Sequence, residues 1–414
     1  MTDRILIIGA GVAALCLARH LQLAGRKVAL IDPQPVTGGA SFGNGGFISP
    51  ASFMPGAQPG MVRKLPTWLR DPLGPLAIRP MAALKDTPWF LRWLKAGRPN
   101  EMERLARVMH GLHRTAFDEW RFLVGPQIFG DLIRREGEML LWDSGDPGAT
   151  EATEKALERE FGEESQVLDR AALEKYYPGL SPVVRRGLVK TGNGHTVSPA
   201  RLCLALADLL RRDGADFIAE KAVKIVPQGG GIHMVLTNCG NHPARDLVVA
   251  AGVWSRDLLQ PLGIRIPLTS QRGYHVMLPA GAADIGMPFI HRGRGIGMTP
   301  MAEGLRIAGT VEFGGIDGLP DERRADQALA HARQLFPQMH GDPVTIWTGQ
   351  RPATPDSLPV LGTPQGHPGL WLCFGSGAYG MTQAPPAGRL AADLILRRKP
   401  LLDPADFAPA RFGA

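Results

Sequence analysis

The sequence has few cysteines and lacks long apolar runs. The four cysteines, none of which has a metal-binding or redox spacing, are Cys16, Cys203, Cys239 and Cys373. Free thiols in a reducing compartment, three of them buried, are the simplest account. No apolar segment reaches transmembrane length, and the chain begins directly with a strand pattern rather than a signal peptide. We therefore expect a cytoplasmic protein that binds no metal.

Acidic residues are scarce in the segment 61–98, which has eight basic side chains against two acidic ones. Tryptophan and phenylalanine are interleaved with this charge, at Trp68, Trp89, Phe90 and Trp93. The segment could lie on a membrane surface. It could also be a solvated excursion, broken by prolines, whose aromatic side chains pack on the protein body, and the prolines favour this second interpretation. No nucleic-acid motif accompanies the net charge of +7, so we expect no nucleic-acid partner.

The chain is long enough for two or three domain-sized units, and its 51 glycines and 36 prolines are typical of a loop-rich α/β protein. Its most informative stretch is the N-terminal one. An apolar strand, Ile5 to Ile8, leads into the G-x-G-x-x-A pattern of Gly9, Gly11 and Ala14. A helix and a second strand follow, and Asp32 ends that strand. This order predicts a site for an ADP-containing dinucleotide.

The chemistry of this pattern is specific. Gly9 allows a tight turn, and Gly11 lets the backbone approach a pyrophosphate. The helix N-terminus, at Val12 and Ala13, directs N–H groups at the phosphates. Asp32 is placed to accept hydrogen bonds from the ribose hydroxyls. The fingerprint alone does not separate NAD from FAD.

Two further glycine-rich turns favour FAD. Residues 33–56 are small, polar and rich in glycine, and no regular element fits them, as expected for backbone lying flat against a planar ligand. Near the C-terminus, a strand leads through the turn that includes Gly377 and Gly380 into a helix predicted from about Pro386 to Arg397. Such a turn could direct N–H groups at the flavin ring edge that becomes negative on reduction. NAD needs no second turn of this kind.

Other elements are placed by periodicity and capping residues. One helix is predicted from Glu101 to Trp120, and another after the N-cap Ser198 and Pro199. A hairpin is expected around 229–231, a strand over 247–251 that ends in a turn at Gly252, a strand over 271–278, and a strand pair over 304–313.

One arginine lies in an unusual setting. Arg351 is followed directly by Pro352, and Pro355 and Pro359 come soon after. Proline restricts both its own backbone and that of the residue before it, so this cation is held on a stiff, non-helical segment. A planar guanidinium matches a carboxylate with two parallel hydrogen bonds.

Four motifs give the chain a resemblance to the D-amino-acid oxidase superfamily of FAD-dependent oxidoreductases, closest to the small-subunit type of bacterial D-amino-acid dehydrogenase. They are GAGVAA with ID, ASFGNGGFISP at 40–50, VVAAGVWS at 248–255, and TGQRPATPDSLPVLG with GSGAYGMT. The resemblance implies a Rossmann-like FAD-binding domain, discontinuous in sequence (1–60, 194–266 and 346–414). A second α+β domain, built on a mixed or antiparallel sheet, would bind the substrate (61–193 and 267–345).

The resemblance also implies roles for individual residues. Arg351 would bind the substrate carboxylate, with Phe47, Ser49, Tyr274 and Tyr379 near the pocket. FAD would be held non-covalently, since Cys373 sits in an apolar strand. Beyond the fingerprint residues, its binding site would include Ser41, Asn44, Gly45, Gly46, Val223, Ala250, Gly252, Gly377, Ala378, Gly380, Met381 and Thr382. This chain differs from close relatives at Phe42 and Gly43, where they carry alanines.

The activity implied is oxidative deamination of an amino acid, D-configured by resemblance. Hydride would pass from Cα to flavin N5, giving a 2-oxo acid and ammonia, and no residue is assigned as a catalytic acid or base. A first alternative is oxidation of a secondary amine such as a proline-, hydroxyproline- or N-methyl-type amino acid. A second is a flavin-holding subunit that needs a partner chain. The electron acceptor (a quinone, the respiratory chain or oxygen) stays open, as does peripheral membrane contact through 61–98.

Overall fold

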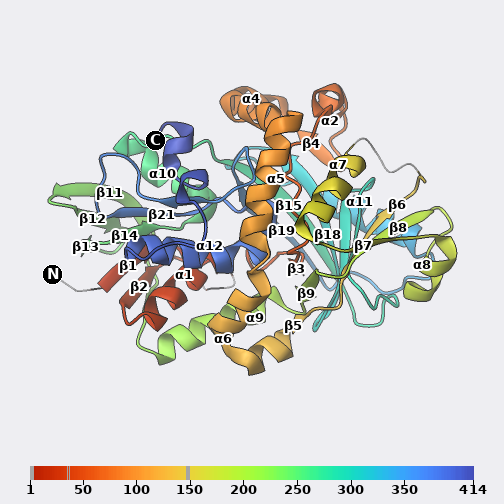
Figure 1. The fold of residues 1–414 in the computed structure, drawn as a ribbon, viewed down its shortest axis with the longest axis horizontal. Coiled ribbons are helices and arrows are strands. Elements are labelled where there is room, and N and C mark those ends of the chain that lie inside the picture. Colours follow the sequence, from red (N-terminus) through yellow and green to blue (C-terminus); the bar gives the residue numbers. More distant parts are fainter. Residues whose placement is uncertain (1–3, 35, 37, 146–149) are drawn as a thin grey trace.

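The computed structural model describes residues 4–34, 36, 38–145 and 150–414, so Pro35 and Thr37 of the predicted glycine-rich loop lie outside the described residues. Two sheets form the two halves of the molecule, with both ends of the chain in the same half (Figure 1). The first sheet has six strands in the order β10-β2-β1-β14-β21-β20. Their bounds are β1 Arg4–Ile8, β2 Lys27–Ile31, β10 Asp216–Ile218, β14 Leu247–Val249, β20 Val360–Gly362 and β21 Leu370–Phe374.

All neighbouring strands of this sheet run parallel except β20, which is antiparallel to β21. Parallel strands are normally covered on both faces, and here the alternate side chains of β1 enter two different cores. One face packs on helices α1 (Val12–Leu23), α9 (Pro199–Arg212) and α12 (Gly380–Ile395). The other packs on a three-stranded sheet of β11 (Ala222–Gly229), β12 (Ile232–Thr237) and β13 (Asn241–Ala244). This is the predicted Rossmann-like half.

The second sheet is mixed, as expected from the resemblance. Its order is β19-β15-β18-β17-β16-β6-β8-β7, and β4 pairs with β18. The pairs of β15 with β18 and β19 are antiparallel, whereas β16 runs parallel to β6. The bounds are β4 Leu76–Ile78, β6 Glu138–Trp142, β7 Ser165–Leu168, β8 Arg186–Lys190, β15 Thr269–Leu278, β16 Phe289–His291, β17 Ile296–Met301, β18 Gly304–Phe313 and β19 Thr345–Ala353.

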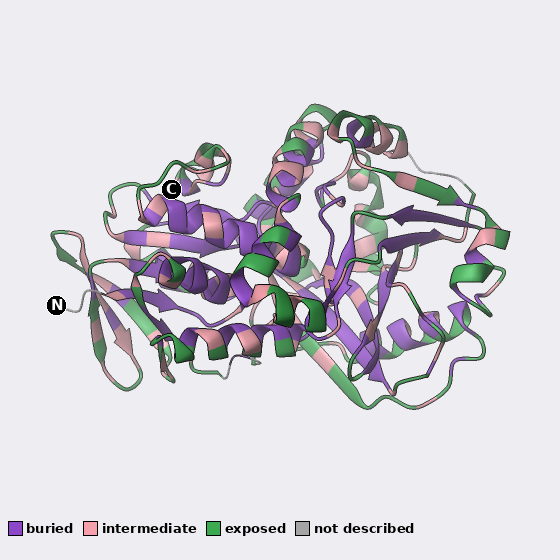
Figure 2. Ribbon diagram, turned by 60° about the horizontal axis from the view of Figure 1, so that its bottom comes forward, coloured by how far each residue is buried: buried purple, intermediate pink, exposed green. Residues whose placement is uncertain are grey.

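Helices α8 (Arg170–Tyr176) and α11 (Arg323–Leu335) cover one face of the second sheet with an apolar core. Its other face meets a small sheet of β3 (Phe47–Ile48), β5 (Ile133–Arg134) and β9 (Gly194–Thr196). Helices α5 (Pro99–His113) and α6 (Ala116–Leu132) run between the halves. Helices α7 (Glu151–Phe161) and α10 (Ser255–Leu259) complete the outside. Figure 2 shows that the strands of both sheets are largely buried.

The basic segment forms α2 (Leu65–Arg70), α3 (Pro80–Lys85) and α4 (Thr87–Ala96), with β4 between α2 and α3. Trp89, Phe90 and Trp93 are buried around Phe313 of β18. The Nε1 of Trp89 donates to the carbonyl of Ala353, at a distance of 2.9 Å. The aromatic side chains therefore pack on the protein body, as the second interpretation of this segment predicted. Among the helices that the structure describes, none combines the length and apolar character needed to cross a bilayer.

Several predicted boundaries were wrong. Residues 304–313 form one strand, not a pair. The predicted helix 101–120 is two helices that break around Thr115. The last helix begins at Gly380 and contains two prolines in its interior. It tolerates Pro385 partly because the Nε1 of Trp120 donates to the carbonyl of Met381, at 2.8 Å, and so replaces the missing backbone donor.

The predicted boundary at residue 346 falls within β19. This strand pairs with β15 from Thr345 to Ala353, so the substrate-side sheet extends past that boundary. Arg351 therefore belongs to the second sheet although the residues after it return to the first.

Candidate active site

The turn between β1 and α1 is built for close approach. Gly9 has a φ of +115°, and a Cβ there would overlap the backbone carbonyl of Ala250 at the end of β14. Only glycine allows both the positive φ and the close approach to Ala250. The backbone of Val12, in the first turn of α1, donates to Ser41 Oγ at 3.0 Å, so the loop after β2 reaches the helix N-terminus. Gly9, Gly11, Val12, Ala13, Ser41 and Ala250 thus lie together, as the sequence predicted.

Asp32 orders this turn through two backbone hydrogen bonds. One carboxylate oxygen accepts from the backbone N–H of Ala10 at 2.7 Å, and the other accepts from that of Gln34 at 2.9 Å. Burial raises the pKa of Asp32, and these two backbone donors oppose that rise. Gly252, with a φ of +57°, begins the turn after β14.

A second helix N-terminus meets the first. A Cβ at Gly380, where α12 begins, would lie 3.8 Å from Asn44 Nδ2 and 4.0 Å from Val12 Cγ1. The turn before it holds Gly377 and Ala378, and Met381 and Thr382 form its first turn. The Thr382 hydroxyl accepts from the backbone N–H of Ser49 at 3.0 Å. The loop 41–46 therefore lies between two helix N-termini, which is a suitable place for the phosphates and the electron-rich edge of a flavin.

The second sheet binds the other side of this loop through its carbonyls. Arg306 of β18 donates to the carbonyls of Phe42, at 3.3 Å, and Asn44, at 2.6 Å. His275 Nδ1 lies 3.1 Å from the Gly43 carbonyl. The Thr299 hydroxyl donates to the Gly45 carbonyl at 2.8 Å, and the Thr196 N–H donates to that of Gly46 at 2.8 Å. The carbonyls of Phe42 to Gly45 thus bond to the second sheet, and that of Gly46 bonds to β9 of the small sheet.

The residues of this region fit FAD. The buried glycine turn, the carboxylate after β2, the two convergent helix N-termini and the glycine-rich loop supply what its phosphates, ribose and ring require. Within the described residues, no group of three or more histidine, cysteine or carboxylate side chains could hold a metal ion.

Arg351 lies on the face of the second sheet that carries these contacts. It pairs across β15 with Gln271, and the next pairs along the strands are Gly273 with Gly349 and His275 with Trp347. Strand alternation puts all six on one face. The guanidinium is half-buried and lies over Gly273, where a Cβ would overlap it. Its Nη1 donates to the Thr310 carbonyl at 3.4 Å.

The charge of Arg351 has no partner of opposite sign: no ion pair within the described ranges joins it to a carboxylate. Burial lowers its pKa to about 10, so the group stays protonated at neutral pH. A partly buried guanidinium without a counter-charge loses hydration, and a ligand carboxylate would offset that loss. This is the arrangement expected for an anion-binding side chain.

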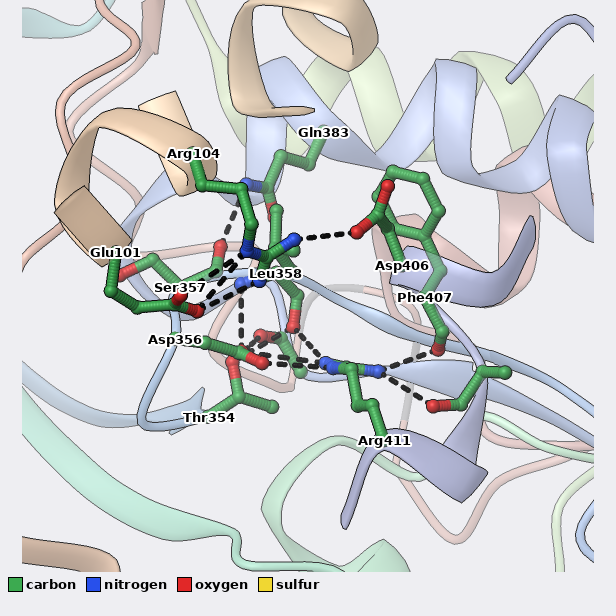
Figure 3. Close-up of polar contacts among 12 residues, drawn as sticks. Glu101, Arg104, Thr354, Asp356, Ser357, Leu358, Gln383, Asp406, Phe407 and Arg411 are labelled. Carbon is green, nitrogen blue, oxygen red and sulfur yellow. Dashed lines mark hydrogen bonds and ion pairs between the residues drawn. The ribbon is translucent and has the colours of Figure 1, made fainter. Parts of the chain in front are cut away.

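The proline-rich segment after Arg351 is fixed from the C-terminus of the chain (Figure 3). Arg411 Nε donates to Asp356 Oδ2 at 2.8 Å, and its Nη2 donates to the Leu358 carbonyl at 2.9 Å. The Thr354 hydroxyl donates to the same carbonyl at 2.8 Å, and the Gln383 amide donates to that of Ser357 at 3.1 Å. This network holds the end of β19 rigid.

Three other predicted residues lie near this face. The Phe47 ring packs on Gly45 and Gly297. The Ser49 hydroxyl donates to Glu138 Oε2 at 2.5 Å, and burial raises the pKa of that glutamate. The Tyr379 hydroxyl donates to the Met54 carbonyl at 2.8 Å, and burial raises its pKa to about 12.

The structure separates two predicted residues from the rest. Tyr274 lies on the opposite face of β15, where its hydroxyl donates to Glu312 Oε2 at 2.5 Å and accepts from the Asp321 N–H at 2.9 Å. Strand alternation and these bonds direct it away from the face of Arg351. Val223 lies in a bulge of β11, in the three-stranded sheet that packs on the first sheet, and the residue is 60% exposed, so its role at the cofactor stays a prediction.

The sequence analysis assigned no role to Arg306, His275, Thr299 or Trp347 at this site. One signal was available for Arg306, because it is the one cation of this strand and stands between Leu305 and Ile307. For the other three, only the pairing of distant strands reveals their position.

Comparison with known proteins agrees with this geometry. The profile of the FAD dependent oxidoreductase family (DAO) matches residues 4–394. The chain belongs to this family. It is 32% identical over 413 residues to a D-amino-acid oxidase of Bradyrhizobium diazoefficiens, covering 98% of both chains. It is also 32% identical to a D-amino acid dehydrogenase of Rhizorhabdus wittichii, covering 99% of this chain and all of the relative.

Solved structures of other enzymes share the fold. Glycine oxidase from Geobacillus kaustophilus matches with a TM-score of 0.73 at 22% identity, over 99% of both chains. L-proline dehydrogenase from P. horikoshii matches with a TM-score of 0.75 at 18% identity, over 99% of this chain and 98% of that one. The protein is therefore an FAD-dependent oxidoreductase, and the expected cofactor and two-part architecture are confirmed.

Proposed function

We propose that this FAD-dependent oxidoreductase oxidises the Cα–N bond of a free amino acid, giving a 2-oxo acid and ammonia after hydrolysis of the imino acid. The observation that carries the proposal is Arg351, a half-buried guanidinium that has no acidic partner among the described residues. It lies on the sheet face that contacts the loop 41–46, which we call the flavin loop. The two curated relatives described above, named for D-amino acids, support the D configuration.

In this proposal, Arg351 binds the carboxylate with its planar fork and thereby orients Cα. Gly273 and Gly349 add no side chain to the sheet surface beside Arg351. The rings of Trp347 and His275 stack with their centroids 5.1 Å apart and form a flat surface next to Gly43. The bound flavin supplies the acceptor for the hydride. The residues of the site bind and orient the substrate. A substrate amine that binds unprotonated needs no dedicated base.

His275 stays neutral in this site. Burial lowers its pKa to about 4, and the nearby Arg306 and Arg351 add to this effect. Since its Nδ1 donates to the Gly43 carbonyl, the neutral ring is the tautomer with its proton on Nδ1. We assign it a positioning role toward the loop, and no role as a base.

The deciding experiment is anaerobic. The purified chain is mixed with D-amino acids, L-amino acids, glycine and cyclic imino acids in turn while the flavin absorbance band is recorded. We expect D-amino acids to bleach the band and to release ammonia. Bleaching by cyclic imino acids with little ammonia would favour the secondary-amine alternative. Bleaching by L-amino acids alone would refute the D assignment. A flavin that no substrate bleaches would favour a subunit that needs a partner chain.

The acceptor of the electrons is a separate question, for which the segment 61–98 is informative. Its outer surface combines exposed apolar side chains with basic ones. The apolar ones are Val62, Leu69, Met81, Leu84 and Leu91. A groove of about 440 Å³ in the same surface is lined by Met61, Val62, Leu91, Leu94, Lys95 and Arg98, among others. Basic charge beside exposed apolar side chains is the chemistry of an anionic membrane surface.

We therefore propose that this surface rests on the inner face of the cell membrane and that the acceptor is a membrane quinone. Sedimentation with vesicles containing anionic lipid tests the first part. Leu84→Ser with Leu91→Ser should reduce binding several-fold. The control Leu319→Ser with Leu401→Ser, at two leucines that are at least as exposed, should not. Equal binding of both double variants would contradict the proposal. Oxygen uptake compared with quinone reduction during turnover tests the second part.

A further inference from the structure

Arg306 is a second buried cation on the same sheet face as Arg351. It lies near the start of β18 and is 4% exposed. Burial lowers its pKa to about 10, so it carries a full charge at neutral pH. In the described part of the chain no ion pair joins it to a carboxylate. Its nearest acidic influence is Glu303, whose carboxylate accepts a hydrogen bond from Ser198.

This arrangement is energetically expensive. A buried guanidinium usually pairs with a carboxylate, because moving the charge out of water costs several kcal/mol. Two carbonyl acceptors offset only part of that cost, and the Nε of Arg306 has no hydrogen-bond partner. The other polar groups around the loop, His275 and Thr299, are neutral. Among the described residues, the sheet face therefore carries two positive charges that form no ion pair with a carboxylate.

The carboxylate of a bound substrate would balance only one of these two positive charges. In the proposed function, the carboxylate of the substrate completes Arg351. Arg306 is turned toward the flavin loop, where it binds the carbonyls of Phe42 and Asn44. We therefore expect the negative charge that balances Arg306 to lie on the cofactor side of the loop.

The peptide groups of the loop connect the charge of Arg306 to the cofactor side. All five carbonyls from Phe42 to Gly46 accept hydrogen bonds from Arg306, His275, Thr299 and the backbone of Thr196. None of the hydrogen bonds among the described residues uses the N–H of Gly43 or Gly45. Carbonyls fixed on one side leave peptide N–H dipoles for the other, and successive N–H groups of this kind stabilise negative charge.

We propose that Arg306 is a positioning residue that holds the flavin loop by its carbonyls and that its uncompensated charge favours the reduced, more negative state of the bound FAD. This inference rests on the family membership and not on the identity of the substrate. It predicts that removing the charge weakens the binding of reduced FAD more than that of oxidised FAD.

The test is the midpoint potential of the bound flavin, measured by equilibration with a reference dye. Arg306→Met keeps an unbranched, flexible side chain, shorter than that of arginine, and removes the charge. We expect the ratio of affinities for reduced and oxidised FAD to fall at least tenfold, which is about 30 mV for a two-electron couple. The control Arg323→Met removes the same charge from an exposed site on α11, and the potential should not move. Arg306→Lys keeps the charge but loses the planar guanidinium, and its midpoint potential should stay close to that of the wild type.

A second variant covers the case in which Arg306→Met fails to retain FAD. Met277 is the cross-strand partner of Arg306 on β15. Met277→Glu would supply the missing carboxylate and should lower the potential in the same direction, whereas Met277→Gln, of the same shape, should not. An unchanged potential in Arg306→Met that still binds FAD, or equal potentials in the two Met277 variants, would overturn the proposal. Neither measurement depends on turnover, so a wrong substrate assignment would leave the result interpretable.

Discussion

The indole ring of Trp347 occupies the space that a β-carbon on Gly43 would need. These residues lie 304 positions apart, one in the flavin loop and the other on the strand that carries Arg351. The indole also covers Gly349 on its own strand, where an added Cβ would again overlap the ring. The glycine at 43, which distinguishes this chain from the pattern it resembles, therefore has a partner: the room that Gly43 leaves is filled by Trp347.

This contact predicts that a second substitution, at Trp347, restores the FAD affinity that a first one, at Gly43, removes. Gly43→Ala should lower FAD affinity at least tenfold, since the loop must move away from the ring by a distance that the close-packed interior does not allow. Adding Trp347→Leu should restore much of the affinity, because the smaller side chain vacates that space. Titration of the apoprotein with FAD measures both. Independent, additive effects of the two substitutions would show that the contact does not limit the loop.

Arg351 gives the second prediction. Arg351→Met should lower kcat/KM for amino acids by an amount equivalent to about 2–5 kcal/mol, since a buried charge pair is lost. Arg351→Lys should recover only part of this loss, because a single ammonium cannot make the two parallel bonds. Steady-state kinetics should include the matching amine that lacks a carboxylate. If the substitution slowed that amine as much as the amino acid, Arg351 would not be the carboxylate anchor.

The network at the C-terminus gives the third. Arg411 and Asp356 form a half-buried ion pair at 2.8 Å, beside the segment that follows β19. A double-mutant cycle of Arg411→Met and Asp356→Asn should show a coupling of about 1–3 kcal/mol in the free energy of unfolding. Either single variant should also raise KM, because the end of the Arg351 strand loses its support. Arg398→Met, a substitution on the exposed turn after α12, serves as the control.

The fourth prediction concerns the loss of folding stability at low pH. His113 is fully buried, its Nδ1 donates to the Ser52 carbonyl at 2.9 Å, and its Nε2 accepts from the Gln383 amide at 3.0 Å. Burial lowers its pKa to about 4, whereas the unfolded chain protonates histidine near 6.5. The neutral ring therefore stabilises the fold above pH 6.5, and this contribution is lost as the pH falls from about 6.5 to about 4. The full difference is about 3 kcal/mol.

Denaturant unfolding of the wild type and of His113→Gln at several pH values measures this effect. Because all other groups titrate in both proteins, the difference between the two curves isolates His113. The wild type should be the more stable protein at pH 7, and its advantage should shrink toward pH 4. A constant difference across that range would mean that His113 is not held neutral in the folded state.

Local sequence patterns were enough to identify the cofactor half of this protein. Gly9, Asp32 and the helix between them follow one another within a single strand–helix–strand unit, so local spacing suffices to specify them. The same holds for the helix capped by Ser198, whose hydroxyl accepts from the Arg201 N–H as expected. Arg351 was recognisable because the prolines around it are local as well.

Tertiary structure decided the rest, because strand partners are chosen by packing between distant segments. Only the pairing of β15 with β18 and β19 shows that Tyr274 turns away from the site while His275, Arg306 and Trp347 turn toward the flavin loop. The start of the last helix was missed for a similar reason. Trp120, far away in the sequence, satisfies the carbonyl that Pro385 leaves without a donor. Local rules gave the residues that bind the cofactor, and long-range pairing determined which side chains surround it.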